Sequence, residues 1–73
     1  MIAAHEVELN RLYEVTNETD HHDIGSLVYA VSVLNERGFR NFKFLWLSGA
    51  YEGRLVEGGR VSFNTMMPLK MIA

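Results

Sequence analysis

Two adjacent histidines followed by an aspartate are the residues of this chain whose types best suit metal binding or acid–base chemistry. His21, His22 and Asp23 lie close to further acids at Glu18 and Asp20. Neighbouring side chains on a helix point about 100° apart and rarely share one ion, whereas useful ligand pairs are spaced at i and i+4. Neither histidine has a defined nucleophile or orienting group in the sequence. We therefore expect no metal site, no cofactor and no enzymatic activity.

Charge divides the chain into an acidic half and a basic half. Residues 1–36 hold seven acids and one base, net −6, and residues 37–73 hold six bases and two acids, net +4, consistent with the overall charge of −2. Such segregation can orient a charged partner or a second copy of the chain, unless the two halves neutralise each other within the fold.

The acidic half predicts a surface for a basic partner. The residues that we expect to form this acidic face are Glu6, Glu8, Glu14, Glu18, Asp20 and Asp23. On a strand, Glu6 and Glu8 would lie roughly 6.8 Å apart on one face, close to the spacing of backbone phosphates. An ordinary solvated acidic face is the alternative.

The basic half favours a different partner class, because its cations alternate with aromatic rings. The candidate nucleic-acid contacts are Arg37, Arg40, Lys43, Arg54 and Arg60. Cations would meet phosphates while exposed rings stack on unpaired bases. The competing interpretation places the rings in the core and the arginines in a solvated rim, and the net negative charge also disfavours general phosphate binding. Nucleic-acid binding is therefore the alternative function.

Size and composition indicate one small domain that gains stability by association. A chain of 73 residues buries only about 60–65% of its unfolded surface, and without cysteine it has no disulfide to compensate.

The absence of cysteine fits a reducing compartment. The first residues lack a signal-peptide pattern, and the apolar run 44–47 is too short to cross a bilayer. We expect a cytoplasmic protein without membrane contact.

The first half of the chain predicts a strand and then a helix. Residues 7–15 alternate between apolar and polar side chains, as a half-buried strand does, although the composition of residues 5–16 also permits a helix. Over residues 20–37 the apolar spacing changes to that of a helix, with Asp20 near its N-cap and Gly38 at its C-cap. Tyr29 lies off the main apolar stripe of this helix.

The second half predicts strands and a hairpin. Residues 42–48 indicate a central strand, and Gly58-Gly59 indicates a two-residue turn. The turn would pair Glu57 with Arg60, Val56 with Val61, and Arg54 with Phe63. In the tail, residues 66–73, Pro68 limits the chain to an edge strand or an apolar arm.

Together these elements predict an α+β domain in β-α-β-β-β order, with one helix on one face of a three- to four-stranded, mostly antiparallel sheet. The other sheet face would then need a partner. We expect a non-catalytic interaction module with a regulatory or inhibitory role, which contacts a larger macromolecule and forms a homodimer. The residues expected in self-association are Tyr29, Met66, Met67, Leu69, Met71 and Ile72.

Overall fold

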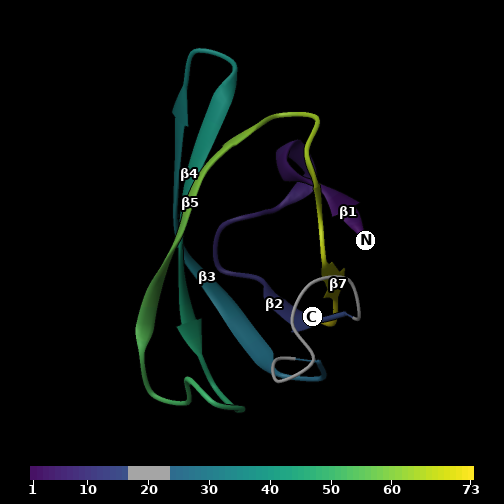
Figure 1. Ribbon diagram of the computed structural model, residues 1–73, viewed down its shortest axis with the longest axis vertical. Helices are drawn as coiled ribbons and strands as arrows, with labels where there is room; N and C mark the ends of the chain where they lie inside the picture. The colour runs from purple at the N-terminus through teal and green to yellow at the C-terminus, as the bar shows by residue number, and fades with distance from the viewer. Residues whose placement is uncertain (17–23) are drawn as a thin grey trace.

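The computed structural model describes residues 1–16 and 24–73, and strands dominate them (Figure 1). The elements are β1 (Ile2–Ala3), the 3-10 helix η1 (Ala4–Glu6), β2 (Leu12–Val15), β3 (Leu27–Glu36), β4 (Phe39–Trp46), β5 (Leu55–Ser62), β6 (Met66–Met67) and β7 (Leu69–Met71). Five strands form an antiparallel sheet in the order β5-β4-β3-β2-β7, and β1 pairs with β6 in a separate two-stranded sheet. Within the described ranges, no helix has the length and apolar character needed to span a membrane.

The predicted helix over residues 20–37 is wrong, and with it the α+β fold of one helix on a three- to four-stranded sheet. Residues 27–36 form the ten-residue strand β3, and no helix of seven or more residues occurs in the part of the chain that the structure describes. The segment contains three valines and one tyrosine, and both residue types favour strands. The pairing of β3 with β4 shifts between Ala30 and Ser32, so Val31 is an extra, bulged residue. One inserted residue breaks the two-residue alternation, and the apolar spacing then imitates a helix.

The predicted hairpin at Gly58-Gly59 is also wrong, because β5 runs straight through both glycines. Phe42 lies opposite Gly59 and Lys43 opposite Glu57, which leaves Gly58 as the bulged residue. A Cβ atom on Gly58 would lie 3.0 Å from the Phe44 ring, so glycine permits β5 to pass close to that ring. The expected pairs within one chain, Glu57–Arg60, Val56–Val61 and Arg54–Phe63, therefore do not form.

The tight hairpin of the fold lies at Arg37-Gly38 instead. These two residues join β3 to β4, and Glu36 faces Phe39 across the turn. Gly38 has φ 69°, the left-handed conformation that the sequence assigned to a helix cap. The residue was correctly predicted to need this backbone conformation, but it serves a β-turn.

The predicted N-terminal strand is shorter than expected. Within residues 7–15, strand β2 begins at Leu12, and the chain before it forms η1 and a loop. The predicted strand over 42–48 corresponds to β4, which lies between β5 and β3. In the tail, β7 is an edge strand of the large sheet, while β6 pairs with β1 on the other side of Pro68.

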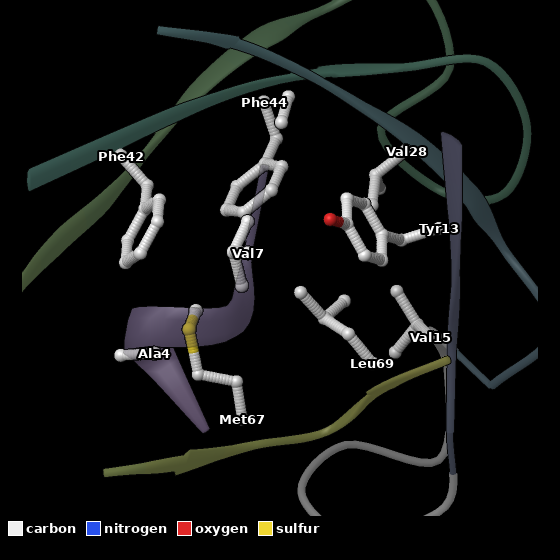
Figure 2. Close-up of a cluster of buried hydrophobic side chains, with 10 residues drawn as sticks. Ala4, Val7, Tyr13, Val15, Val28, Phe42, Phe44, Met67 and Leu69 are labelled. Carbon is white, nitrogen blue, oxygen red and sulfur yellow. The ribbon is translucent and has the colours of Figure 1, made fainter. Parts of the chain in front are cut away.

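The core lies between the large sheet and the segments that cross it, η1 and β6 (Figure 2). Tyr13, Phe42, Val7 and Val28 are its largest fully buried side chains. Phe42 stacks on Phe44 with ring centroids 5.7 Å apart. Methionine and leucine from the tail complete the cluster (Figure 2).

The hydroxyl of Tyr13 connects this core to the loop after η1. It accepts a hydrogen bond of 2.7 Å from the backbone N–H of Glu8, while the tyrosine itself is fully buried. We expect Tyr13→Phe to lower the free energy of unfolding by about 1 kcal/mol, since one hydrogen bond is lost and the ring packing stays. Urea unfolding measures this loss. Tyr51→Phe is the matched control, because Tyr51 is 38% exposed and its hydroxyl makes no hydrogen bond to the described residues. Equal losses in both variants would contradict an anchoring role for the Tyr13 hydroxyl.

Candidate interaction surfaces

The large sheet has an outer face that points away from the core, and one row of apolar side chains crosses it. Directly paired residues of antiparallel strands lie on the same face. Leu12 pairs with Tyr29, Tyr29 with Leu45, and Leu45 with Leu55. Their neighbours along the strands, including Tyr13 and Phe44, point into the core. The row therefore spans four strands, from β2 to β5.

Two further leucines extend this row. Leu27 follows along β3 on the same face, and Leu47 lies beside it, with its N–H bonded to the Leu27 carbonyl at 2.8 Å. We define the outer patch by these six residues: Leu12, Leu27, Tyr29, Leu45, Leu47 and Leu55. Leu55 is 58% exposed and Leu47 45% exposed, and the other four are half-buried. The outer patch is thus a contiguous apolar surface rather than a set of scattered side chains.

The other end of the outer face is mostly polar and charged, although Leu34 and Phe39 also lie there. Lys43 lies opposite Glu57 across β4 and β5. Further along, the Arg60 guanidinium lies 4.1 Å from the centre of the Phe39 ring, and its Nε is 3.2 Å from a Glu36 carboxylate oxygen. Both partners of this ion pair are more than half exposed, so it adds little stability. Charges of both signs therefore border the outer patch.

The structure does not bring the five predicted basic residues into one surface. Lys43 and Arg60 lie on the outer face, Arg37 is at the β3–β4 turn, and Arg54 is in the connection between β4 and β5. Arg40 points to the core side, where its guanidinium donates to the carbonyl oxygens of Ala4 at 2.7 Å and Val7 at 2.9 Å.

The aromatic side chains among these basic residues are also unavailable for base stacking. Phe42 and Phe44 are buried, and Phe39 is half-buried beneath the Arg60 guanidinium. Trp46 packs edge-on against Tyr51 with ring centroids 5.2 Å apart. The interleaving of cations and rings in the sequence therefore does not produce a surface on which exposed rings lie among basic side chains.

The predicted acidic face is only partly described. Glu6 and Glu8 lie on η1 and in the loop after it, so they do not have the spacing of a strand, and Glu6 accepts a hydrogen bond of 2.9 Å from the N–H of Ala3. Glu14 lies on the outer face between Lys70 and Leu27. The remaining predicted acids and the two adjacent histidines lie outside the described residues: Glu18, Asp20, Asp23, His21 and His22.

The predicted self-association residues are dispersed over the fold. Tyr29 belongs to the outer patch, whereas Met67 and Leu69 are buried in the core. Met71 is half-buried beside Tyr13, and an Arg11 Nη atom lies 3.1 Å from its sulfur. Of the predicted self-association residues in the tail, Met66 and Ile72 remain exposed.

Besides a cleft of about 260 Å³ on the outer face, whose lining includes Ser32, Lys43 and Glu57, two clefts show what chemistry the described residues offer. A cleft of about 410 Å³ is lined by His5, Glu6 and Glu8 together with Ile2 and Met71. The described residues of its lining include no hydroxyl, thiol or amine nucleophile, and the described ranges contain no group of three or more metal-binding side chains. The carboxylate of Glu6 is already engaged with the backbone.

The second cleft, of about 180 Å³, lies on the core side and is apolar. Phe44, Trp46 and Val56 line one part of it, and Met67 and Leu69 line another. The Trp46 Nε1 atom is enclosed and has no hydrogen-bond partner among the described residues. Among the described residues no charged side chain lines this cleft, so these residues supply no group for acid–base activation of a substrate there.

No protein-family model, curated protein or solved structure matches this chain.

Proposed function

We propose that this protein is a non-catalytic interaction domain that binds a larger protein through the outer patch and regulates it by contact. The observation that carries the proposal is the row from Leu12 to Leu55, an uninterrupted apolar strip on the outer face. Contiguous exposed apolar surface bordered by polar groups is typical of protein interfaces. The pairs Glu14–Lys70 and Lys43–Glu57 supply this polar border.

A protein partner fits this surface better than a nucleic acid does. The outer patch itself contains no cation, and the three basic residues elsewhere on the outer face, Lys43, Arg60 and Lys70, each have an acid nearby. Lys43 lies opposite Glu57, and Arg60 pairs with Glu36. Local neutralisation leaves little positive potential for phosphates. Leucine side chains instead gain most by burial against another apolar surface.

The proposal can be tested with a photoreactive benzoylphenylalanine at position 29, in the centre of the outer patch. Irradiation in a lysate of the source cells should cross-link one discrete protein, and an excess of unlabelled wild-type protein should abolish that adduct. The same probe at position 51 reports contacts outside the outer patch. The absence of any adduct at position 29 that wild-type protein competes away would refute the proposal.

The contribution of one leucine to partner binding can be measured by using a variant as the unlabelled competitor in the same cross-linking experiment. We expect Leu47→Lys to compete at least about tenfold more weakly than wild type, because it removes roughly 1.5–3 kcal/mol of apolar burial from the interface. Leu9→Lys is the matched control, since Leu9 is 51% exposed and lies in the loop before β2. Both variants should unfold at nearly the wild-type temperature. If Leu47→Lys and Leu9→Lys compete equally well, the outer patch is not the binding surface.

A further inference from the structure

Strand β5 presents an edge of eight residues that is unpaired within the described part of the chain. It is the last strand of the large sheet, and no described strand pairs with its outward side. Two hydrogen bonds to the β4 side, Trp46 N–H to Arg54 at 3.0 Å and Phe63 N–H to Gly38 at 3.2 Å, show which residues bond inward. Alternation along the strand then directs the backbone groups of Glu57 and Arg60 outward. Exposed groups of this kind are a template for another strand.

The sequence along this edge is complementary to itself in antiparallel orientation. Val56-Glu57-Gly58-Gly59-Arg60-Val61 has an acid and a base at equal distances from its centre, and valines outside them. If a second copy aligns about a two-fold axis at the glycines, each Glu57 faces Arg60 of the other copy. Each Val56 likewise faces the other Val61. The same complementarity underlies the predicted hairpin. Within one chain the pairs Glu57–Arg60 and Val56–Val61 do not form, because β5 does not turn at the glycines.

The bulge at Gly58 makes such a pairing geometrically consistent. Residues three positions apart on a regular strand point to opposite faces. The extra residue restores Glu57 and Arg60 to the same face: Glu57 pairs with Lys43, Arg60 pairs with Asn41, and both pairs lie on the outer face. A two-fold axis perpendicular to the sheet preserves the face of each side chain, so both Glu57–Arg60 contacts can form simultaneously.

Charge at this edge favours a second copy rather than repelling it. Natural edge strands are commonly protected by charges and bulges, and like charges brought together across the edge would prevent association. Here the alignment would place Glu57 between Lys43 of its own chain and Arg60 of the other. Glu57 and Arg60 are exposed, so both are accessible to a partner.

We propose that β5 pairs antiparallel with β5 of a second copy of this chain, which forms a symmetric dimer with one continuous sheet. The inference goes beyond the proposed function, because it uses the sheet edge rather than the outer patch. In the dimer the two outer patches lie on the same side of the sheet. A larger partner could therefore contact both.

Charge exchange tests this pairing. Sedimentation equilibrium should show that wild-type protein dimerises, and that Glu57→Arg and Arg60→Glu each weaken the dimer at least about tenfold, because each places like charges together at two sites. A mixture of the two single variants should regain the wild-type affinity as a heterodimer, since every charge then faces its opposite. Circular dichroism should confirm that both variants keep the wild-type fold.

Three outcomes would overturn the inference. They are a monomeric wild type up to about 1 mM, single variants that dimerise as strongly as wild type, and a mixture that associates no better than its components. The Leu47→Lys variant should dimerise normally, so failure of this pairing is distinguishable from failure of the outer patch as a binding surface.

Discussion

Replacing Arg40 with methionine is expected to lower the free energy of unfolding by about 3 kcal/mol. The guanidinium donates to the carbonyls of Ala4 and Val7, two residues that are almost fully buried, and through Nε to Asn35 at 2.9 Å. Charged hydrogen bonds are each worth roughly 1.5–3 kcal/mol, and their loss leaves the Ala4 carbonyl with only the N–H of Val7 at 3.3 Å and takes from the Val7 carbonyl its charged donor. The segment around η1 would therefore detach more readily from the sheet.

Thermal unfolding measures this effect directly. For a domain of this size, a loss of about 3 kcal/mol corresponds to a decrease in Tm of roughly 12–24 °C. Arg37→Met is the matched control, because it removes the same charge from the exposed turn of the β3–β4 hairpin and should change stability by less than about 0.5 kcal/mol. If the two variants lose stability equally, net charge rather than the contacts of Arg40 is responsible.

Gly49→Ala is expected to cost about 3 kcal/mol. Gly49 has φ 86°, and a Cβ atom there would collide with the Ser26 hydroxyl and lie 3.0 Å from the Ser26 Cβ. Ser26 is 3% exposed and cannot easily move, because its carbonyl accepts the N–H of Val15 at 2.9 Å. The variant therefore combines left-handed backbone strain of about 1–2 kcal/mol with overpacking of about 1–3 kcal/mol.

Gly53→Ala separates these two contributions. Gly53 has nearly the same backbone angle, φ 83°, but no atom of the described residues lies within 4 Å of the position that a Cβ would take. This variant should lose only about 1–2 kcal/mol from backbone strain. Chemical denaturation of both variants measures the difference. Equal losses would show that Ser26 moves away and that Gly49 is not held by packing.

A dimer formed through β5 would combine with the outer patch to give a bivalent surface. Two patches on one rigid sheet raise the effective concentration of the second contact once the first has formed. A small domain with modest binding at each patch could therefore hold a larger partner tightly. The proposed dimer would also supply the stabilisation that a short chain without disulfides was expected to need.

Local patterns in the sequence correctly predicted several features of the chain. The aromatic alternation that begins at Phe42 predicted the strand β4, and Gly38 was correctly expected to take a left-handed conformation. Both features depend on near neighbours in the chain. Steric preference and alternation act over a few residues, so the sequence alone contains them.

The bulges depend on a partner strand and could not be predicted in this way. Val31 is a bulged residue of β3 only because its partner strand β4 sets the register. Gly58 is a bulged residue of β5 only because that strand passes close to the Phe44 ring of β4. An unseen bulge makes a strand resemble a helix, and an adjacent pair of glycines resembles a hairpin turn. Neither error could be corrected without the pairing of the strands.

The composition of the candidate surfaces also depends on contacts between residues far apart in the sequence, so tertiary structure determines it. Arg40 contacts carbonyls more than thirty residues away, and this contact removes it from any basic patch. The outer patch collects leucines from four strands whose alignment no local pattern contains. By itself, the sequence determined which residues are apolar, charged or free to take a left-handed backbone. Only the folded sheet decided which of them share a face, because the face of a strand residue depends on the register of its partners.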